Sequence, residues 1–196
     1  YDVDNKNVVY PTPPEPIQRY MLAGYWMPRD ANWSPDFPTA AQQVQALYTL
    51  SKGSKTNGVL AFDQLAIQNL LKALGPIPVA SYPEPLTDKN VLIAMRSAWD
   101  PGTGQSTDRQ WFENRKNFMG DMGKAMMEEL LAMRSPDVVL SVVRSLLYSM
   151  RAGHLQVYFN DLAAQAQLAS LDLDRSLRTA NGDFLMLVDW NFGFNK

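Results

Sequence analysis

The chain has 196 residues, of which 46% are hydrophobic and 19% are charged, and its formal net charge is -2 at pH 7. This length and balance suit one globular domain with a single core, and they exclude a disordered chain. The mild acidity excludes the strongly basic surface that is typical of nucleic-acid-binding proteins. The sequence has no cysteine and a single histidine, His154, which excludes disulfides, a cysteine nucleophile and a multi-histidine metal site within one chain.

The two ends of the sequence suggest a piece of a longer protein. No apolar run approaches the roughly 18 residues that span a bilayer, and no signal peptide opens the chain. Tyr1 is followed by polar residues, and Lys196 comes soon after a strongly apolar pattern. We therefore expect residues 1–196 to form one partial or processed α/β domain, with membrane contact made only by missing parts.

Helical periodicity and short apolar runs alternate along the chain after an extended, proline-rich start. In chain order, we expect helices at residues 17–22, 39–52, 64–74, 88–99, 107–133, 136–153 and 162–168. The expected strands cover residues 58–62, 155–159 and 183–190. Strands that alternate with helices indicate an α/β fold, here a mixed central sheet packed by several helices and incomplete at both ends.

Several element boundaries are predicted from capping residues. Asp63 is an N-cap candidate directly after the first strand, Thr87 is another before the fourth helix, and Asp161 is a third before the last helix. Gly53 is a natural helix stop. Since glycine weakens a helix interior, we expect the long helix to break near Gly120 or Gly123.

The loop at residues 27–37 is the first candidate site. It places Arg29, Asp30, Asn32 and Asp36 between aromatic residues. Arginine suits bidentate recognition of phosphate or carboxylate groups, and carboxylates can hold a divalent cation. The alternative, which the composition favours, is an ion pair of Arg29 with Asp30 or Asp36 that only fixes the loop.

The start of the long helix is the second candidate site. Helical spacing brings Arg109, Arg115 and Lys116 near one another, and a basic cluster at a helix N-terminus favours an anion. The favoured alternative is a solvated helix face with Asp108 and Glu113 as partners.

Two weaker candidates lie towards the end of the chain. His154 falls between a helix and a strand, where capping of the last helical carbonyls is more common than catalysis. Asp189 and Asn191 come where a strand ends, a place that often lines ligand sites in α/β folds. The alternative for these two is turn chemistry. Methionines of the long helix are typical core residues, and would mark a partner-binding surface if exposed.

Nearly the whole chain resembles the bacterial envelope family called domain of unknown function 4012. The resemblance is carried by the loop at residues 29–38, by residues 58–63 with Gly75-Pro-Ile77, and by the stretches at 115–116, 154–161 and 183–191. Membership in such a family implies an extracytoplasmic location, in the cell envelope or at the cell surface.

A more distant resemblance connects the chain with the LytR–CpsA–Psr transferases, which move glycopolymers from polyprenyl-pyrophosphate lipids to the cell wall. Pro28-Arg29-Asp30 matches a motif of that family, and Arg115-Lys116 fills the place of its Arg-Gln pair. The resemblance implies a LytR–CpsA–Psr-like fold in which Arg29 and Arg115 act on the pyrophosphate as catalytic residues. Asp30 would join them and help to hold Mg²⁺.

Two functions stay open at this point. The first is an envelope protein that binds or transfers polyprenyl-pyrophosphate-linked glycopolymers as a Mg²⁺-dependent phosphotransferase. The second is a non-catalytic assembly module whose arm at residues 8–10 adds to the sheet edge of a neighbour, as in a homo-oligomer. Whether the chain is an enzyme depends on which of the two holds.

Overall fold

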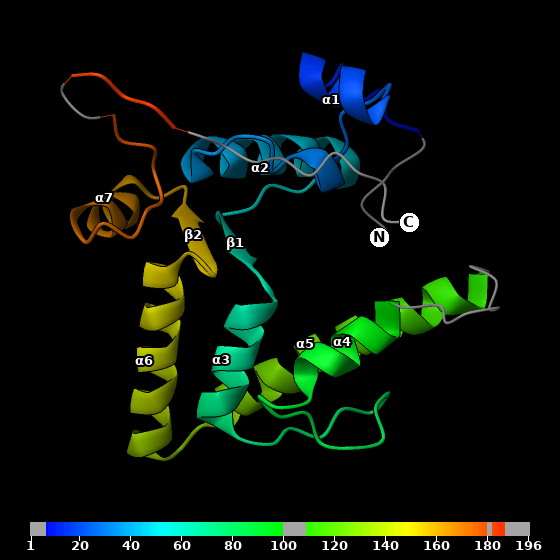
Figure 1. Cartoon of the computed structure of the whole chain (residues 1–196), viewed down its shortest axis with the longest axis vertical. Helices are drawn as coiled ribbons and strands as arrows, with labels where there is room; N and C mark the ends of the chain where they lie inside the picture. The colour runs from blue at the N-terminus through cyan, green and yellow to red at the C-terminus, as the bar shows by residue number, and fades with distance from the viewer. Residues whose placement is uncertain (1–6, 100–108, 180–181, 187–196) are drawn as a thin grey trace. The chain divides into compact units, whose positions relative to one another are not determined.

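The computed structural model describes residues 7–99, 109–179 and 182–186, and for residues 99 and 109–116 it describes the helical backbone. Figure 1 shows a mainly helical protein with one small sheet. In chain order the elements are α1 Glu15–Met21, the 3₁₀ helix η1 Pro28–Asp30, α2 Phe37–Lys52, β1 Gly58–Phe62, α3 Gln64–Leu74, α4 Val91–Trp99, α5 Arg109–Ala132, α6 Pro136–Ala152, β2 Leu155–Phe159 and α7 Leu162–Ser170.

β1 and β2 pair as an antiparallel two-stranded sheet (Figure 1). At one end the amide of Asn160 donates to the carbonyl of Asn57 at 2.9 Å, and at the other the amide of Asp63 donates to the carbonyl of His154 at 3.0 Å. The predicted mixture of helices and strands is therefore confirmed, but the sheet in the described part of the chain is smaller than expected. Residues 183–186 of the third expected strand form no strand, and residues 187–190 lie outside the described residues.

The chain divides into two compact units. Unit 1 consists of residues 1–60 and 156–196, and unit 2 consists of residues 61–155. The expectation of one domain stays a prediction.

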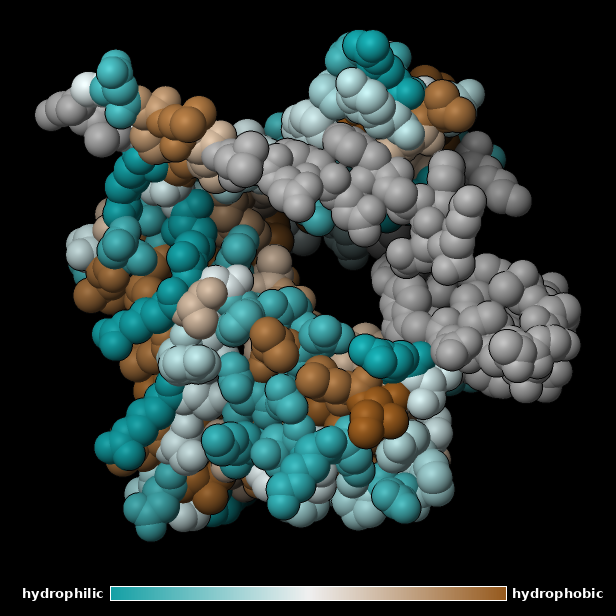
Figure 2. Space-filling model, viewed as in Figure 1, coloured by the Kyte–Doolittle hydropathy of each residue, from teal (hydrophilic) through white to brown (hydrophobic). Residues whose placement is uncertain are grey.

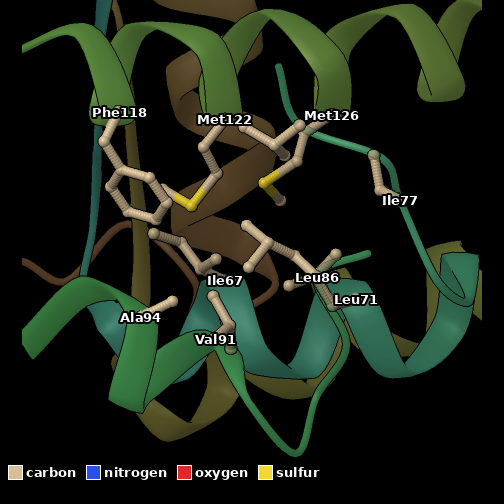
Figure 3. Close-up of a cluster of buried hydrophobic side chains, with 10 residues drawn as sticks. Ile67, Leu71, Ile77, Leu86, Val91, Ala94, Phe118, Met122 and Met126 are labelled. Carbon is tan, nitrogen blue, oxygen red and sulfur yellow. The ribbon is translucent and has the colours of Figure 1, made fainter. Parts of the chain in front are cut away.

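Unit 2 is built around the packing of α3, α4 and α5 (Figure 3). Phe118, Met122 and Met126 follow one another at intervals of four along α5, so that they share one helix face and meet Ile67 and Leu71 of α3. The sequence prediction of core methionines is confirmed for Met122 and Met126, which are buried.

Unit 1 has a smaller core around the loop that leads into α2. Tyr10, Ala31 and Leu47 are buried together, and partly buried apolar side chains pack against them. The amide of Trp26 donates to the carbonyl of Pro11 at 2.8 Å, so the proline-rich arm and the loop after α1 are joined locally.

Most predicted helix ends are confirmed. The Asp63 side chain caps α3, the Asp161 side chain caps α7, and Gly53 ends α2 in the left-handed conformation. Thr87 makes the predicted capping contacts at the start of α4: its Oγ1 accepts from the amide of Lys89 at 3.3 Å, and its carbonyl accepts from the amide of Val91 at 3.0 Å. Asn90 Oδ1 accepts in return from the amide and hydroxyl of Thr87. The predicted first residue was wrong, because residues 88–90 form a turn and the helix begins at Val91.

The predicted break of the long helix was also wrong, because α5 runs from Arg109 to Ala132 without interruption. A glycine costs a helix about 1 kcal/mol relative to alanine. Phe118 and Met122 flank Gly120 and are both buried, and burial of each such side chain is worth about 1.5–3 kcal/mol. The core packing therefore outweighs the glycine.

We predict opposite effects for two glycine substitutions. A Cβ at position 58 would lie 2.3 Å from the carbonyl oxygen of Tyr158, so Gly58→Ala must move the β-ladder and should lower the free energy of unfolding by about 1–3 kcal/mol. Nothing lies within 4 Å of a Cβ at position 120, so Gly120→Ala should raise it by about 0.5–1 kcal/mol. Urea denaturation measures both. Equal effects of the two substitutions would contradict the close approach at Gly58.

Candidate functional site

The Pro28-Arg29-Asp30 turn is fixed by its neighbours in unit 1. Pro28 occupies the first position of η1, where its constrained φ suits the turn. The amide of Asp30 donates to the carbonyl of Met27 at 2.9 Å, and Trp26 Nε1 donates to the carbonyl of Asp30 at 3.1 Å. Since Ala31 is fully buried directly after the turn, the backbone that carries Arg29 is anchored in the core of unit 1.

Arg29 and Asp30 form an ion pair, with 3.6 Å between Arg29 Nε and Asp30 Oδ2. The Arg29 side chain is 57% exposed, whereas that of Asp30 is 13% exposed. The pair is one of the two that the sequence suggested. The carboxylate is the more buried partner, and it contacts the guanidinium through Nε while more than half of the arginine side chain remains exposed to solvent. Asn32, a further candidate, is exposed.

Asp36 has a structural role that the sequence did not predict. Its Oδ2 accepts hydrogen bonds from the amide of Thr39 at 2.9 Å and from the hydroxyl of Thr39 at 2.5 Å, so it is the N-cap of α2. Its Oδ1 accepts from the amide of Leu177 at 2.8 Å. The carboxylate therefore joins the loop to a segment 141 positions later in the sequence.

The pKa of Asp36 reflects these contacts. Partial burial raises the pKa of the carboxyl, but the hydrogen bonds from the Thr39 hydroxyl and from the amides of Leu177 and Thr39 lower it more, so the pKa lies below its ordinary value. Asp36 is therefore ionised at neutral pH, and both of its carboxylate oxygens accept hydrogen bonds.

The segment at residues 172–178 is held by Asp36 and by its own ion pairs. The carbonyl of Arg175 accepts from the amide of Phe37 at 3.2 Å. Arg178 pairs with the buried Asp174 at 2.8 Å and also with Asp172. Two aspartates followed closely by two arginines over this stretch were the sequence signal that could have indicated such a cluster.

A second arrangement of polar side chains lies in unit 2, where Asp63 and His154 meet. Asp63 Oδ2 lies 2.7 Å from His154 Nδ1, while Asp63 Oδ1 accepts from the amides of Leu65 and Ala66 at 2.8 and 3.0 Å. The backbone amide of His154 donates to the carbonyl of Ser149 at 2.8 Å. The amide of His154 thus contributes to capping the end of α6, and its ring joins that helix end to the start of α3.

The same contacts determine the pKa of Asp63. Burial raises the pKa, but the hydrogen bond from the Ala66 amide, the hydrogen bond and charge of His154, and the bond from the Leu65 amide together bring it below its ordinary value. An aspartate that orients a histidine ring is a common feature of general-base sites. In this protein the same two residues also cap the start of α3 and the end of α6, which is a structural role that involves no substrate.

The remaining candidate residues are only partly described. Arg109, Arg115 and Lys116 belong to the first two turns of α5, and their side chains lie outside the described residues. Asp189 and Asn191 also lie outside them. The structure therefore pairs Arg29 with Asp30. Asp36 instead caps α2 and binds the amide of Leu177.

Within residues 7–99, 109–179 and 182–186, no group of three or more histidine, cysteine, aspartate or glutamate side chains is placed to hold a metal ion. Among the helices of the same residues, none has the length and apolar character to cross a membrane.

Comparison with known proteins identifies a matching family. The model of the family described as protein of unknown function (DUF4012) matches residues 1–99, which contain the Arg29–Asp30 pair and Asp36. No curated protein and no solved structure matches the chain.

We predict that Asp36→Ala destabilises the protein more than Asp161→Ala. Asp161 accepts one hydrogen bond from the amide of Ala164 as the N-cap of α7, and loss of such a cap costs about 0.5–2 kcal/mol. Asp36→Ala removes a cap and also leaves the Leu177 amide without its acceptor, which should add about 1 kcal/mol. Urea denaturation at neutral pH measures the difference. A smaller loss for Asp36→Ala would refute the anchoring role.

We also predict an acid-sensitive contribution from Asp63. A carboxyl whose pKa is lowered by folding stabilises the protein above its unfolded pKa, near 3.8, and loses this contribution as the pH falls through the folded value. Asp63→Asn should therefore lower the free energy of unfolding at pH 7 and have a smaller effect below about pH 3. Denaturation at a series of pH values tests this, and Asp161→Asn is the matched N-cap control. A difference from the parent that does not change with pH would contradict the prediction.

Proposed function

The chain belongs to the family of proteins of unknown function DUF4012, and we propose that it is an extracytoplasmic protein of the cell envelope that binds pyrophosphate-linked lipids through Arg29. The proposal assumes that the chain is similar to the LytR–CpsA–Psr transferases both in its fold and in its Pro28-Arg29-Asp30 motif. The ligand class is a polyprenyl pyrophosphate that carries a glycopolymer.

The Arg29 side chain, more than half exposed on a fixed turn and paired with Asp30, is the observation that supports this function. A phosphate-binding arginine needs donors that reach solvent and a position that costs little to maintain. Arg29 is more than half exposed, and Pro28, Trp26 and the buried Ala31 hold the backbone that carries it. Asp30 restricts the side chain from one side, so less rotamer freedom is lost on binding.

In the proposal, Asp30 is the residue that would bind Mg²⁺. Magnesium is commonly bound by one or two carboxylates together with water and substrate phosphates, and a single carboxylate beside an exposed arginine is compatible with that pattern. Asp30 would contribute one oxygen, and Mg²⁺ would supply charge neutralisation of the diphosphate. Asp36 is unsuited to the same role because its two oxygens already accept hydrogen bonds from Thr39 and Leu177.

Glycopolymer transfer is the catalytic form of the proposal. In it Arg29, Arg115 and Asp30 would stabilise the charge that develops on the leaving diphosphate, since fixed cations act most strongly where charge accumulates. Asn32, Arg109, Lys116, Asp189 and Asn191 are kept as further binding residues of the same proposal.

The second candidate is a non-catalytic assembly module. Exposed apolar side chains in the N-terminal part of unit 1, namely Val9, Tyr20, Leu22 and Tyr25, favour it. Val9 lies beside the buried Tyr10, so the arm is fixed at one residue while its neighbour remains available to another subunit. A particle mass that rises with protein concentration in light scattering would support this candidate.

We predict that Arg29→Ala weakens the binding of a short polyprenyl pyrophosphate by about tenfold to a hundredfold. A hydrogen bond to a charged group is worth about 1.5–3 kcal/mol, which corresponds to this range. Calorimetric titration with and without Mg²⁺ measures the effect, and Arg115→Ala should reduce affinity in the same way.

Arg19→Ala is the matched control, because Arg19 is an exposed arginine of unit 1 that pairs with Glu15 in α1. It should leave the affinity unchanged. Equal binding by the parent, Arg29→Ala and Arg115→Ala would exclude the proposed site. Loss of binding in the Arg19 variant as well would indicate a nonspecific charge effect, which also contradicts the proposal.

A further inference from the structure

Helix α6 of unit 2 has an apolar face that no described element covers. Val139, Val143 and Leu147 follow one another at intervals of four, and Leu140 joins them on the same face. These four side chains are between 39% and 48% exposed. We call them the α6 stripe.

The side of α6 that adjoins the stripe already has its partner within unit 2. α6 packs against α3, with Val142 and Ser149 buried and Asn69 Nδ2 donating to Ser149 Oγ at 3.3 Å. α3 therefore covers one half of a wide apolar face of α6, and the stripe is the half that remains exposed. An amphipathic helix normally buries its apolar residues, so the exposed half indicates a second surface that the helix contacts.

The charges beside the stripe are mainly basic. By helical spacing Arg144 and Arg151 lie along one edge of the stripe, and both are exposed. Asp137, the acidic residue of α6, lies on the same edge in the first turn, two turns before Arg144, so the two arginines outnumber it. Tyr148, which is 61% exposed, lies beyond the same edge and combines an apolar ring with a polar hydroxyl. Along the edge that α6 occupies, Figure 2 shows hydrophobic side chains between long hydrophilic ones.

We propose that the α6 stripe rests on an anionic lipid surface. Valine and leucine side chains would enter the boundary between headgroups and acyl chains, and the arginines beside them would reach the lipid phosphates. This surface belongs to unit 2 and does not depend on the Arg29 site of unit 1. It departs from the expectation that only missing parts of the protein contact the membrane.

A second copy of the chain fits the stripe less well. In a two-fold pairing of α6 with itself, the midpoint of the stripe is Val143, and Arg144 is the next residue. Such a pairing would bring the Arg144 side chains of the two copies close together, and like charges at that position oppose association. An anionic surface instead attracts them.

Co-sedimentation of the full chain with vesicles tests the proposal. Vesicles of phosphatidylcholine are compared with vesicles of phosphatidylcholine and phosphatidylglycerol in equal parts, at low and high potassium chloride. We expect binding to the anionic vesicles that weakens with salt. Leu140→Gln/Val143→Gln should reduce the partition coefficient by at least about tenfold, and Arg144→Gln by about fivefold.

α4 supplies matched controls in the same unit. Ile93 is 65% exposed and Arg96 is also exposed, so Ile93→Gln and Arg96→Gln remove similar groups outside the stripe. Both should bind vesicles as the parent does, and circular dichroism should show that all variants remain folded. Absence of binding to anionic vesicles, or equal loss in the α4 variants, would overturn the proposal. So would a dimer that Leu140→Gln/Val143→Gln abolishes in the absence of lipid binding, because the stripe would then be an interface between copies.

Discussion

The antiparallel pairing of β1 with β2 is the constraint on which the chain's organisation depends. Its last hydrogen bonds involve Asp63 and His154, which lie 91 positions apart in the sequence. Everything from α3 to α6 lies between these two points, and both boundaries between the units fall within the paired strands. A two-stranded sheet is only marginally stable in isolation, so the strands depend on the cores of the units that they connect.

Local signals in the sequence predicted most of the helices and both described strands. Side-chain caps such as Asp63 and Asp161 and the left-handed Gly53 act within a few residues of themselves, and their effect can be read from the sequence. Thr87 belongs with these caps, although α4 begins three residues later than predicted. The continuity of α5 could not be predicted in this way, because it depends on burial of Phe118 and Met122 by other helices.

For the candidate site, too, the sequence predicted local contacts but not contacts between distant parts of the chain. Arg29 and Asp30 are adjacent, so their pairing follows from local chemistry. The role of Asp36 depends on the Leu177 amide, and the contact of Asp63 with His154 depends on strand pairing. Neither partner can be identified from a local pattern. The sequence correctly predicted that Asp63 caps α3. The contact of its other carboxylate oxygen with the His154 ring could not be predicted, because it depends on the fold.

The position of unit 2 within the chain has a consequence for the history of the protein. The chain leaves unit 1 along β1 and returns to it along β2, on neighbouring strands. In terms of connectivity, residues 61–155 are therefore an insertion into a hairpin. A hairpin can be interrupted at its turn with little effect on the pairing of its strands, because the two ends of the insert are already close together. The same connectivity would accept an insert of another length or content between the two strands without a change to the loop that carries Arg29 and Asp36.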